Sequence, residues 1–99
     1  MDYSCSMSDE LLSIFWIEVG EHLEALNNAM LQAEMLPPED KDNYTALVRE
    51  MNRVAHSMKG AARAVGISAI ETISHYMEEV FGAAQNGSLD LTPEVADTI

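Results

Sequence analysis

The chain has 99 residues, which is enough for one domain with one modest core. Its 17 acidic residues outnumber the 5 lysines and arginines and give a formal net charge of −12, which argues against binding to nucleic acid or to an anionic membrane surface. No apolar run approaches the roughly 18 residues of a membrane-spanning helix, the N-terminus lacks the pattern of a secretory signal, and a single cysteine excludes an intrachain disulfide scaffold, so we expect a cytoplasmic protein.

The first predicted element is a helix over residues 8–35. Ser8 is expected to be its N-cap, because a serine side chain can accept a hydrogen bond from the first turn. Apolar residues recur at steps of three and four, which is the spacing of one helical face: Leu12, Phe15, Val19, Leu23, Leu26, Met30 and Ala33. Pro37 and Pro38 are expected to end the helix.

Two further helices are predicted over residues 43–65 and 68–85. Gly66 is a natural C-cap for the second helix. The third is expected to begin at Ser68, whose spacing from Glu71 is that of a capping box. The two apolar faces consist of Leu47, Met51, Val54, Met58, Ala62 and Val65 in the second helix, and of Ile70, Ile73, Met77, Phe81 and Ala84 in the third.

A fourth helix is predicted to start at Thr92, because Thr92, Pro93 and Glu94 have the pattern of a cap, a first-turn proline and a first-turn acid. The chain ends at Ile99, about two turns later. We therefore expect residues 1–99 to be one histidine-bearing helical domain from the N-terminal part of a longer protein. Amphipathic helices, short loops and the lack of strand-like alternation predict an all-α, up-down helical bundle with three full helices and the start of a fourth.

The basic residues are concentrated around one histidine. All five lie between positions 41 and 66, where only two acids accompany them. On a helical wheel of about 100° per residue, His56 points away from the apolar face of the second helix. Within roughly 60° of it lie four cations and one glycine: Arg49, Arg53, Lys59, Gly60 and Arg63.

This arrangement suits phosphoryl chemistry. A neutral imidazole nitrogen is a good nucleophile near pH 7, and a phosphorylated His56 would carry roughly two negative charges. Lys59 follows one turn later and is placed to reach those charges. Gly60 destabilises a helix interior by about 1 kcal/mol relative to alanine, but its missing side chain leaves room for a phosphoryl group and a docking partner.

The same segment resembles a known family. HSMKGAA at positions 56–62 is similar to the H-S-x-K-G signature of histidine phosphotransfer (HPt) domains, and most similar to the N-terminal phosphotransfer domain of chemotaxis-type histidine kinases. FWIEVGEHL at positions 15–23 resembles the family's first helix, and HYME at positions 75–78 resembles the H-x-x-E of a later helix. The resemblance covers nearly the whole chain in order.

The resemblance implies a helical bundle that serves as a phosphorelay module in two-component signal transduction. His56 would be phosphorylated through its outward nitrogen, with Lys59 assisting the phosphoryl group and Gly60 providing clearance. Glu78 would accept a hydrogen bond from the other ring nitrogen and so fix the tautomer, as carboxylates do for histidines elsewhere. His75 would flank the same network.

The resemblance also implies partners. His56 would receive the phosphoryl group from the ATP-binding domain of a histidine kinase and donate it to an aspartate of a response-regulator receiver domain. Arg53 and Arg63 share the face of His56, and we expect them to contribute to binding. Since the chain has no glycine-rich phosphate loop, we expect it to bind no cofactor, to be inactive as a catalyst alone, and to depend on ATP bound by a separate kinase domain.

Two alternatives remain open. The chain could be an acidic helical adaptor that acts without phosphorylation, in which case binding would survive replacement of His56. It could also be a hydrolytic or metal enzyme that uses His56, His75 and Glu78, with Glu79 as a fourth ligand. Because cations surround His56 and the spacing matches no closed zinc site, we predict no metal site.

Overall fold

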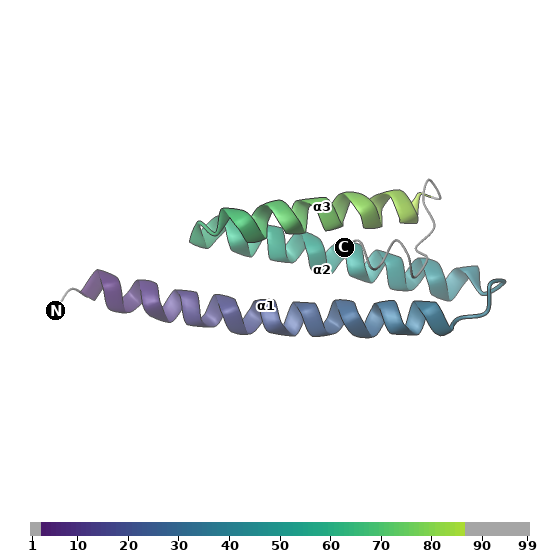
Figure 1. Cartoon of the computed structure of the whole chain (residues 1–99), viewed down its shortest axis with the longest axis horizontal. Helices are drawn as coiled ribbons and strands as arrows, with labels where there is room; N and C mark the ends of the chain where they lie inside the picture. Colours follow the sequence, from purple (N-terminus) through teal and green to yellow (C-terminus); the bar gives the residue numbers. More distant parts are fainter. Residues whose placement is uncertain (1–2, 87–99) are drawn as a thin grey trace.

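Three helices build the described part of the chain. The computed structural model describes the backbone of residues 3–86 and the side chains of residues 9–86. Its helices are α1 (Tyr3–Met35), α2 (Lys41–Val65) and α3 (Ser68–Gln85). Figure 1 shows that α2 runs antiparallel to both neighbours, and that α1 extends beyond the turn between α2 and α3. The prediction of an all-helical bundle is confirmed, whereas the predicted helix start at Thr92 lies outside the described residues.

Of the two predicted ends of α1, only the C-terminal one agrees with the structure. The helix ends at Met35, just before Pro37 and Pro38, as predicted. It begins at Tyr3, so Ser8 lies inside the helix and the prediction that Ser8 is its N-cap is wrong. The residues before Ser8 include no glycine or proline, and nothing in the local sequence stops the helix from extending toward the N-terminus.

The start of α2 is fixed by an aspartate. Asp40 is the N-cap, and its Oδ1 accepts a hydrogen bond from the backbone N–H of Asn43 at 3.3 Å. Its other carboxylate oxygen accepts a bond from Asn43 Nδ2 at 2.8 Å. This cap satisfies one of the free N–H groups of the first turn, and α2 therefore begins at Lys41, two residues earlier than predicted.

A tight turn joins α2 to α3. Gly66 has a φ of 77°, in the left-handed region, and the N–H of Ile67 donates to the carbonyl of Ala62 at 2.9 Å, which is the pattern of a Schellman motif. The predicted C-cap at Gly66 is confirmed. The predicted capping box at Ser68 is wrong, because Ser68 is already the first residue of α3 and Ile67 occupies the cap position without a side-chain bond. Backbone bonds close this turn instead.

The core lies along α2. One cluster of buried residues joins all three helices and consists of Leu26, Ala29, Val48, Met51, Val54, Ala55, Met58, Met77, Phe81 and Ala84. A smaller cluster near the turn consists of Phe15, Val19 and Ala62. Leu23 and Ile73 were predicted in the core but are half exposed. Each lies about 80° around its helix from the buried phenylalanine of that helix, Phe15 or Phe81, at the margin of the buried face.

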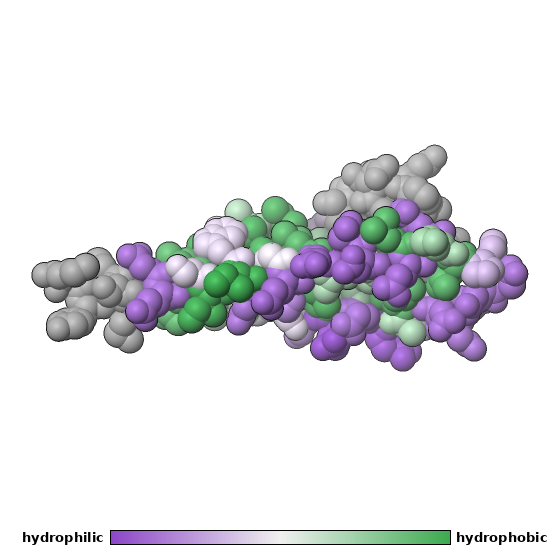
Figure 2. Space-filling model, turned by 90° about the horizontal axis from the view of Figure 1, so that it is seen from below, coloured by the Kyte–Doolittle hydropathy of each residue, from purple (hydrophilic) through white to green (hydrophobic). Residues whose placement is uncertain are grey.

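Exposed apolar residues are not evenly distributed. Figure 2 looks at the side occupied by α1 and shows apolar surface gathered on its N-terminal half, while hydrophilic residues dominate the other half. The large exposed apolar residues of this half are Leu11, Ile14, Trp16 and Ile17. None of the described helices combines the length and the apolar character that a membrane crossing requires.

Candidate functional site

His56 stands on the outside of the bundle. Its side chain is 70% exposed, while Ala55 and Met58 on the same helix are buried. The expected exposure of His56 is therefore confirmed. The ring Nδ1 lies 3.2 Å from Oε2 of Glu78, which belongs to α3. Two helices thus contribute to the site, and α2 presents the ring while α3 supplies a carboxylate behind it.

Glu78 is the centre of the polar cluster. Its side chain is only 24% exposed, and besides His56 it binds Lys59, whose Nζ lies 3.3 Å from Oε1 and 3.1 Å from Oε2. Partial burial by itself raises the pKa of the Glu78 carboxyl, but the hydrogen bonds from Lys59 and His56 outweigh it, so the pKa is lowered from its ordinary value of 4.5. Glu78 is therefore a carboxylate at neutral pH.

The charge of Glu78 decides which imidazole nitrogen carries the hydrogen. An ionised carboxylate can only accept hydrogen bonds, so the Nδ1 of His56 must donate to it. In the neutral ring the other nitrogen, Nε2, then has the free lone pair. Because the ring is mostly exposed, this lone pair is accessible to a partner molecule. The site combines a fixed tautomer with an open nucleophilic atom.

Lys59 lies closer to the interface than the sequence predicted. Its side chain is 19% exposed, because α3 covers the edge of α2 on which it lies. An ammonium group has three hydrogen-bond donors, and two contacts to Glu78 leave one donor for another acceptor. Lys59 is thus placed to hold Glu78 and to meet an anion near His56 at the same time.

Gly60 has no structural reason within the described residues to be a glycine. It is exposed, its φ lies outside the left-handed region, and a Cβ added to it would meet nothing within 4 Å. Glycine destabilises a helix interior by about 1 kcal/mol relative to alanine. The role of Gly60 as clearance beside His56 remains a prediction.

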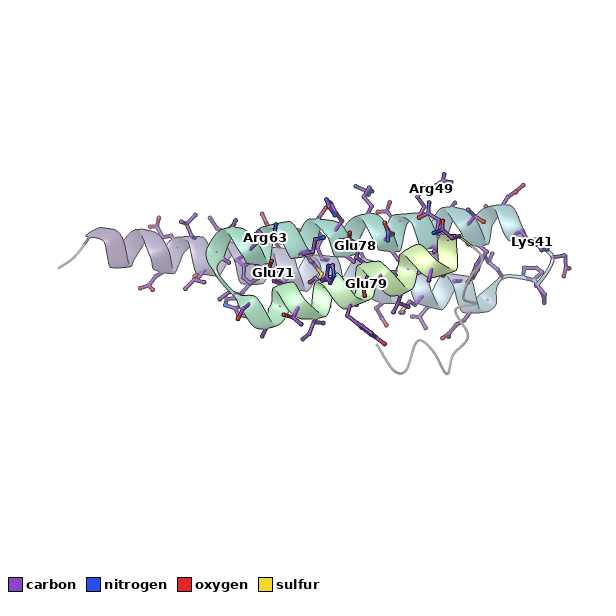
Figure 3. All side chains as sticks on the ribbon, turned by 90° about the horizontal axis from the view of Figure 1, so that it is seen from above. Lys41, Arg49, Arg63, Glu71, Glu78 and Glu79 are labelled. Atoms are coloured by element: carbon purple, nitrogen blue, oxygen red, sulfur yellow. The ribbon has the colours of Figure 1, made fainter. Side chains whose placement is uncertain are left out.

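Two of the three arginines expected on this face, Arg53 and Arg63, have acidic partners of their own. Arg63 Nε lies 2.8 Å from Oε2 of Glu71, and Figure 3 shows this pair near the turn, along the bundle from Glu78. Arg53 Nε donates to Glu50 at 3.1 Å. The expected ring of cations around His56 is thus partly neutralised, because the bundle provides carboxylates for Arg53 and Arg63. Their roles in binding remain predictions.

His75 also has a partner on its own helix. Its Nε2 lies 3.1 Å from Oε1 of Glu79, one turn further along α3. The contact found for His75 is therefore with Glu79, and its predicted place in the network of His56 and Glu78 remains a prediction. Within the described part of the chain, no group of three or more histidine, cysteine, aspartate or glutamate residues could hold a metal ion.

One contact of the site was missed by the sequence analysis. Nδ2 of Asn52 donates to the backbone carbonyl of Glu78 at 2.9 Å, between partly buried groups. Asn52 lies one turn before His56 on α2. The available signal was weak: asparagine is a poor helix former, and this one lies in the middle of a long helix where no cap or turn needs it.

The sequence of the chain is similar to those of known proteins. The family model described as "Hpt domain" matches residues 10–99. "Chemotaxis protein CheA" of Listeria monocytogenes is 34% identical over 93 residues, which is 94% of this chain and 14% of that protein. "Sensor histidine kinase CheAY" of Helicobacter pylori is 31% identical over 91% of this chain and 11% of that protein, and "Chemotaxis protein CheA" of Bacillus subtilis is 29% identical over 92% and 13%. The chain thus spans about one seventh or less of these relatives. No solved structure matches it.

Proposed function

Because this chain belongs to the Hpt domain family, we propose that His56 accepts a phosphoryl group from a histidine kinase and passes it to an aspartate of a response-regulator receiver domain. The observation that carries the proposal is the exposed imidazole of His56, held at Nδ1 by the carboxylate of Glu78. This arrangement leaves Nε2 as the nucleophile. The relatives include a sensor histidine kinase and chemotaxis proteins, which supports a role in two-component signalling.

The phosphoryl group would be transferred in two steps. The lone pair of His56 Nε2 attacks the γ-phosphorus of ATP held by the kinase domain, and an N–P bond forms as the bond to the ADP oxygen breaks. A carboxylate oxygen of the receiver's aspartate then attacks the same phosphorus, and the N–P electron pair returns to Nε2. The ATP belongs to the kinase domain, and this domain supplies only the acceptor atom and its surroundings.

Glu78 and Lys59 would act on charge during the first step. When Nε2 forms its bond to phosphorus, the ring becomes cationic, and the carboxylate 3.2 Å from Nδ1 stabilises that charge. The third donor of Lys59 would bind a phosphoryl oxygen. Gly60 would leave room for the incoming group, and His75 would steady the network from α3 through its own pair with Glu79.

The partners would meet the face of α2 that carries His56. To bind a partner's carboxylate or phosphoryl group, Arg53 and Arg63 would share or exchange their present acids, Glu50 and Glu71. We place the phosphoryl transfer in the cytoplasm, where a kinase domain has access to ATP. The kinase domain would lie elsewhere in the same polypeptide or in another protein.

Labelling with radioactive ATP tests the proposal. Incubation of the chain with the ATP-binding domain of a cognate kinase should label the wild type and not His56→Gln. His22→Gln on α1 is the matched control and should label like the wild type. Addition of the receiver domain should then remove the label from the chain. Equal labelling of His56→Gln and the wild type would refute the proposal, and signalling that survives His56→Gln would support the adaptor alternative.

A further inference from the structure

A side chain of α2 binds the main chain of α3 directly behind the site. Asn52 Nδ2 donates to the backbone carbonyl of Glu78 at 2.9 Å, across 26 positions of sequence. Asn52 is one helical turn before His56, so its side chain lies on the same flank of α2 that faces α3. The asparagine therefore contacts the backbone of the residue whose carboxylate holds His56.

This contact is not needed to satisfy the backbone. The Glu78 carbonyl lies inside α3, where it accepts the N–H of residue 82 in the ordinary helical pattern. A carbonyl oxygen has a second lone pair, and Asn52 uses it. Since the Glu78 carbonyl is already paired within α3, the effect of the bond from Asn52 is to link α2 to α3.

Gly82 keeps this second lone pair accessible. In a helix, the side chain four residues later lies over a carbonyl, and residue 82 has none. A Cβ built on Gly82 would lie 3.7 Å from Asn52 Nδ2, which is ordinary contact distance. One added carbon would fit, but a branched side chain would occupy the position of the amide. Asn52 and Gly82 thus form a matched pair across the two helices.

The polar cluster at His56 needs such a constraint. The contacts of Glu78 with His56 and Lys59 are 3.1–3.3 Å long. A slide of α3 by one residue, about 1.5 Å, would lengthen or misalign them. Partly exposed ion pairs contribute little net stability and cannot set the register of two helices by themselves. The bond from Asn52 to the main chain is independent of the Glu78 rotamer and acts on the helix itself.

We propose that Asn52 is a positioning residue that fixes α3 along α2 and so keeps the Glu78 carboxylate within hydrogen-bond reach of His56 Nδ1. Its importance for phosphoryl transfer rests on the function proposed above, whereas its effect on the imidazole does not. Without Asn52 the bundle keeps its apolar core, but Glu78 samples positions from which it no longer selects the tautomer of His56.

The test uses Asn52→Leu, which keeps the approximate shape of the side chain and removes the donor. Nitrogen NMR of the unphosphorylated chain measures which nitrogen of His56 carries the hydrogen, and Glu78→Gln gives the reference for complete loss of the carboxylate. We expect Asn52→Leu to shift the tautomer populations toward those of Glu78→Gln, with no loss of thermal stability. Asn28→Leu, the same change on the exposed side of α1, should leave the tautomer of the wild type.

A second pair of variants approaches the same contact from α3. Gly82→Ala should keep the wild-type tautomer, since one carbon fits, whereas Gly82→Val should reproduce the shift of Asn52→Leu. With the kinase domain, Asn52→Leu should be phosphorylated about three- to tenfold more slowly than the wild type, near the lower end of what outer-shell carboxylate partners contribute. A wild-type tautomer in both Asn52→Leu and Gly82→Val would overturn the proposal. Failure of the wild type to be phosphorylated would refute the proposed function instead, and the NMR comparison would still decide the role of Asn52.

Discussion

Helix α3 meets α2 through apolar packing and through directed polar contacts, whereas the packing of α1 on α2 described above is apolar. The contacts of Asn52, His56, Lys59 and Arg63 all run from α2 to α3. Apolar packing fixes how closely two helices approach, and directed bonds also fix which atoms face each other. The side of the bundle that performs the proposed chemistry is therefore the side with directed bonds, and α1 contributes mainly buried surface.

The largest expected difference between the two sides is in stability. Phe81→Ala removes a fully buried ring of α3 from the main cluster, and we expect the free energy of unfolding to fall by about 3–5 kcal/mol. Ile17→Ala removes a side chain of α1 that is 63% exposed, and the change should stay within about 0.5 kcal/mol. Denaturant unfolding measures both. Similar losses in the two variants would mean that the exposed face of α1 is covered in solution.

The next largest effect is on the rate of phosphorylation, and it should differ between two carboxylates of α3 that each pair with a cation of α2. Glu78→Gln should slow phosphorylation of His56 by about 10- to 100-fold, because a neutral amide holds the ring tautomer and stabilises its positive charge less well. Glu71→Gln breaks only the pair with Arg63 and should change the rate by less than about twofold. Initial rates with the kinase domain decide. If both variants slow the reaction equally, the site extends along the whole interface.

Two exposed helical glycines sharpen the comparison between α1 and α2. A Cβ added to Gly20 or to Gly60 meets nothing within 4 Å, so alanine at either position should stabilise the chain by about 1 kcal/mol. Only Gly60→Ala should also slow phosphorylation, because its methyl group enters the space beside His56. Paired measurements of unfolding and of labelling test this. Full activity of Gly60→Ala would remove the argument that Gly60 provides clearance.

The smallest expected effect is on the pH dependence of stability. The pKa of the Glu78 carboxyl is lowered in the folded chain, so its contribution to stability is present above the ordinary value of 4.5 and is lost as the pH falls below it. The difference in unfolding free energy between the wild type and Glu78→Gln should therefore be largest near neutral pH and should narrow in acid. Urea unfolding at a series of pH values measures it. A constant difference would show that the carboxylate charge is not what stabilises the contact.

The sequence predicted most of α2 and its outward face. A regular apolar stripe placed His56 and Gly60 opposite the core, because a single helix obeys its own period wherever its neighbours lie. The exposure of Lys59 depends on where α3 packs against α2, and the helical period of α2 carries no information about that. Asn52 was missed for the same reason, since its partner is a main-chain carbonyl, and every residue type offers one.

The helix ends show the same division. Gly66 was predicted as a C-cap because glycine adopts the left-handed region easily, and its φ of 77° lies in that region. Ser68 is not a cap, because it is already the first residue of α3 and Ile67 occupies the cap position. Pairing of Glu78 with His56 was expected only from the family resemblance, because spacing within one helix says nothing about reach between two.

Because of the tight turn at Gly66, the residues of the proposed site lie close together in the sequence. His56 and Glu78 are only 22 positions apart, and closing so short a segment costs little conformational entropy. Contacts between residues close in sequence favour fast folding. The hairpin of α2 and α3 can therefore assemble the acceptor and its carboxylate before the long first helix docks. Substitutions on the exposed face of α1 can then change the stability of the chain or the partners it binds without changing the residues that carry out phosphoryl transfer. The buried face of α1 has to stay apolar.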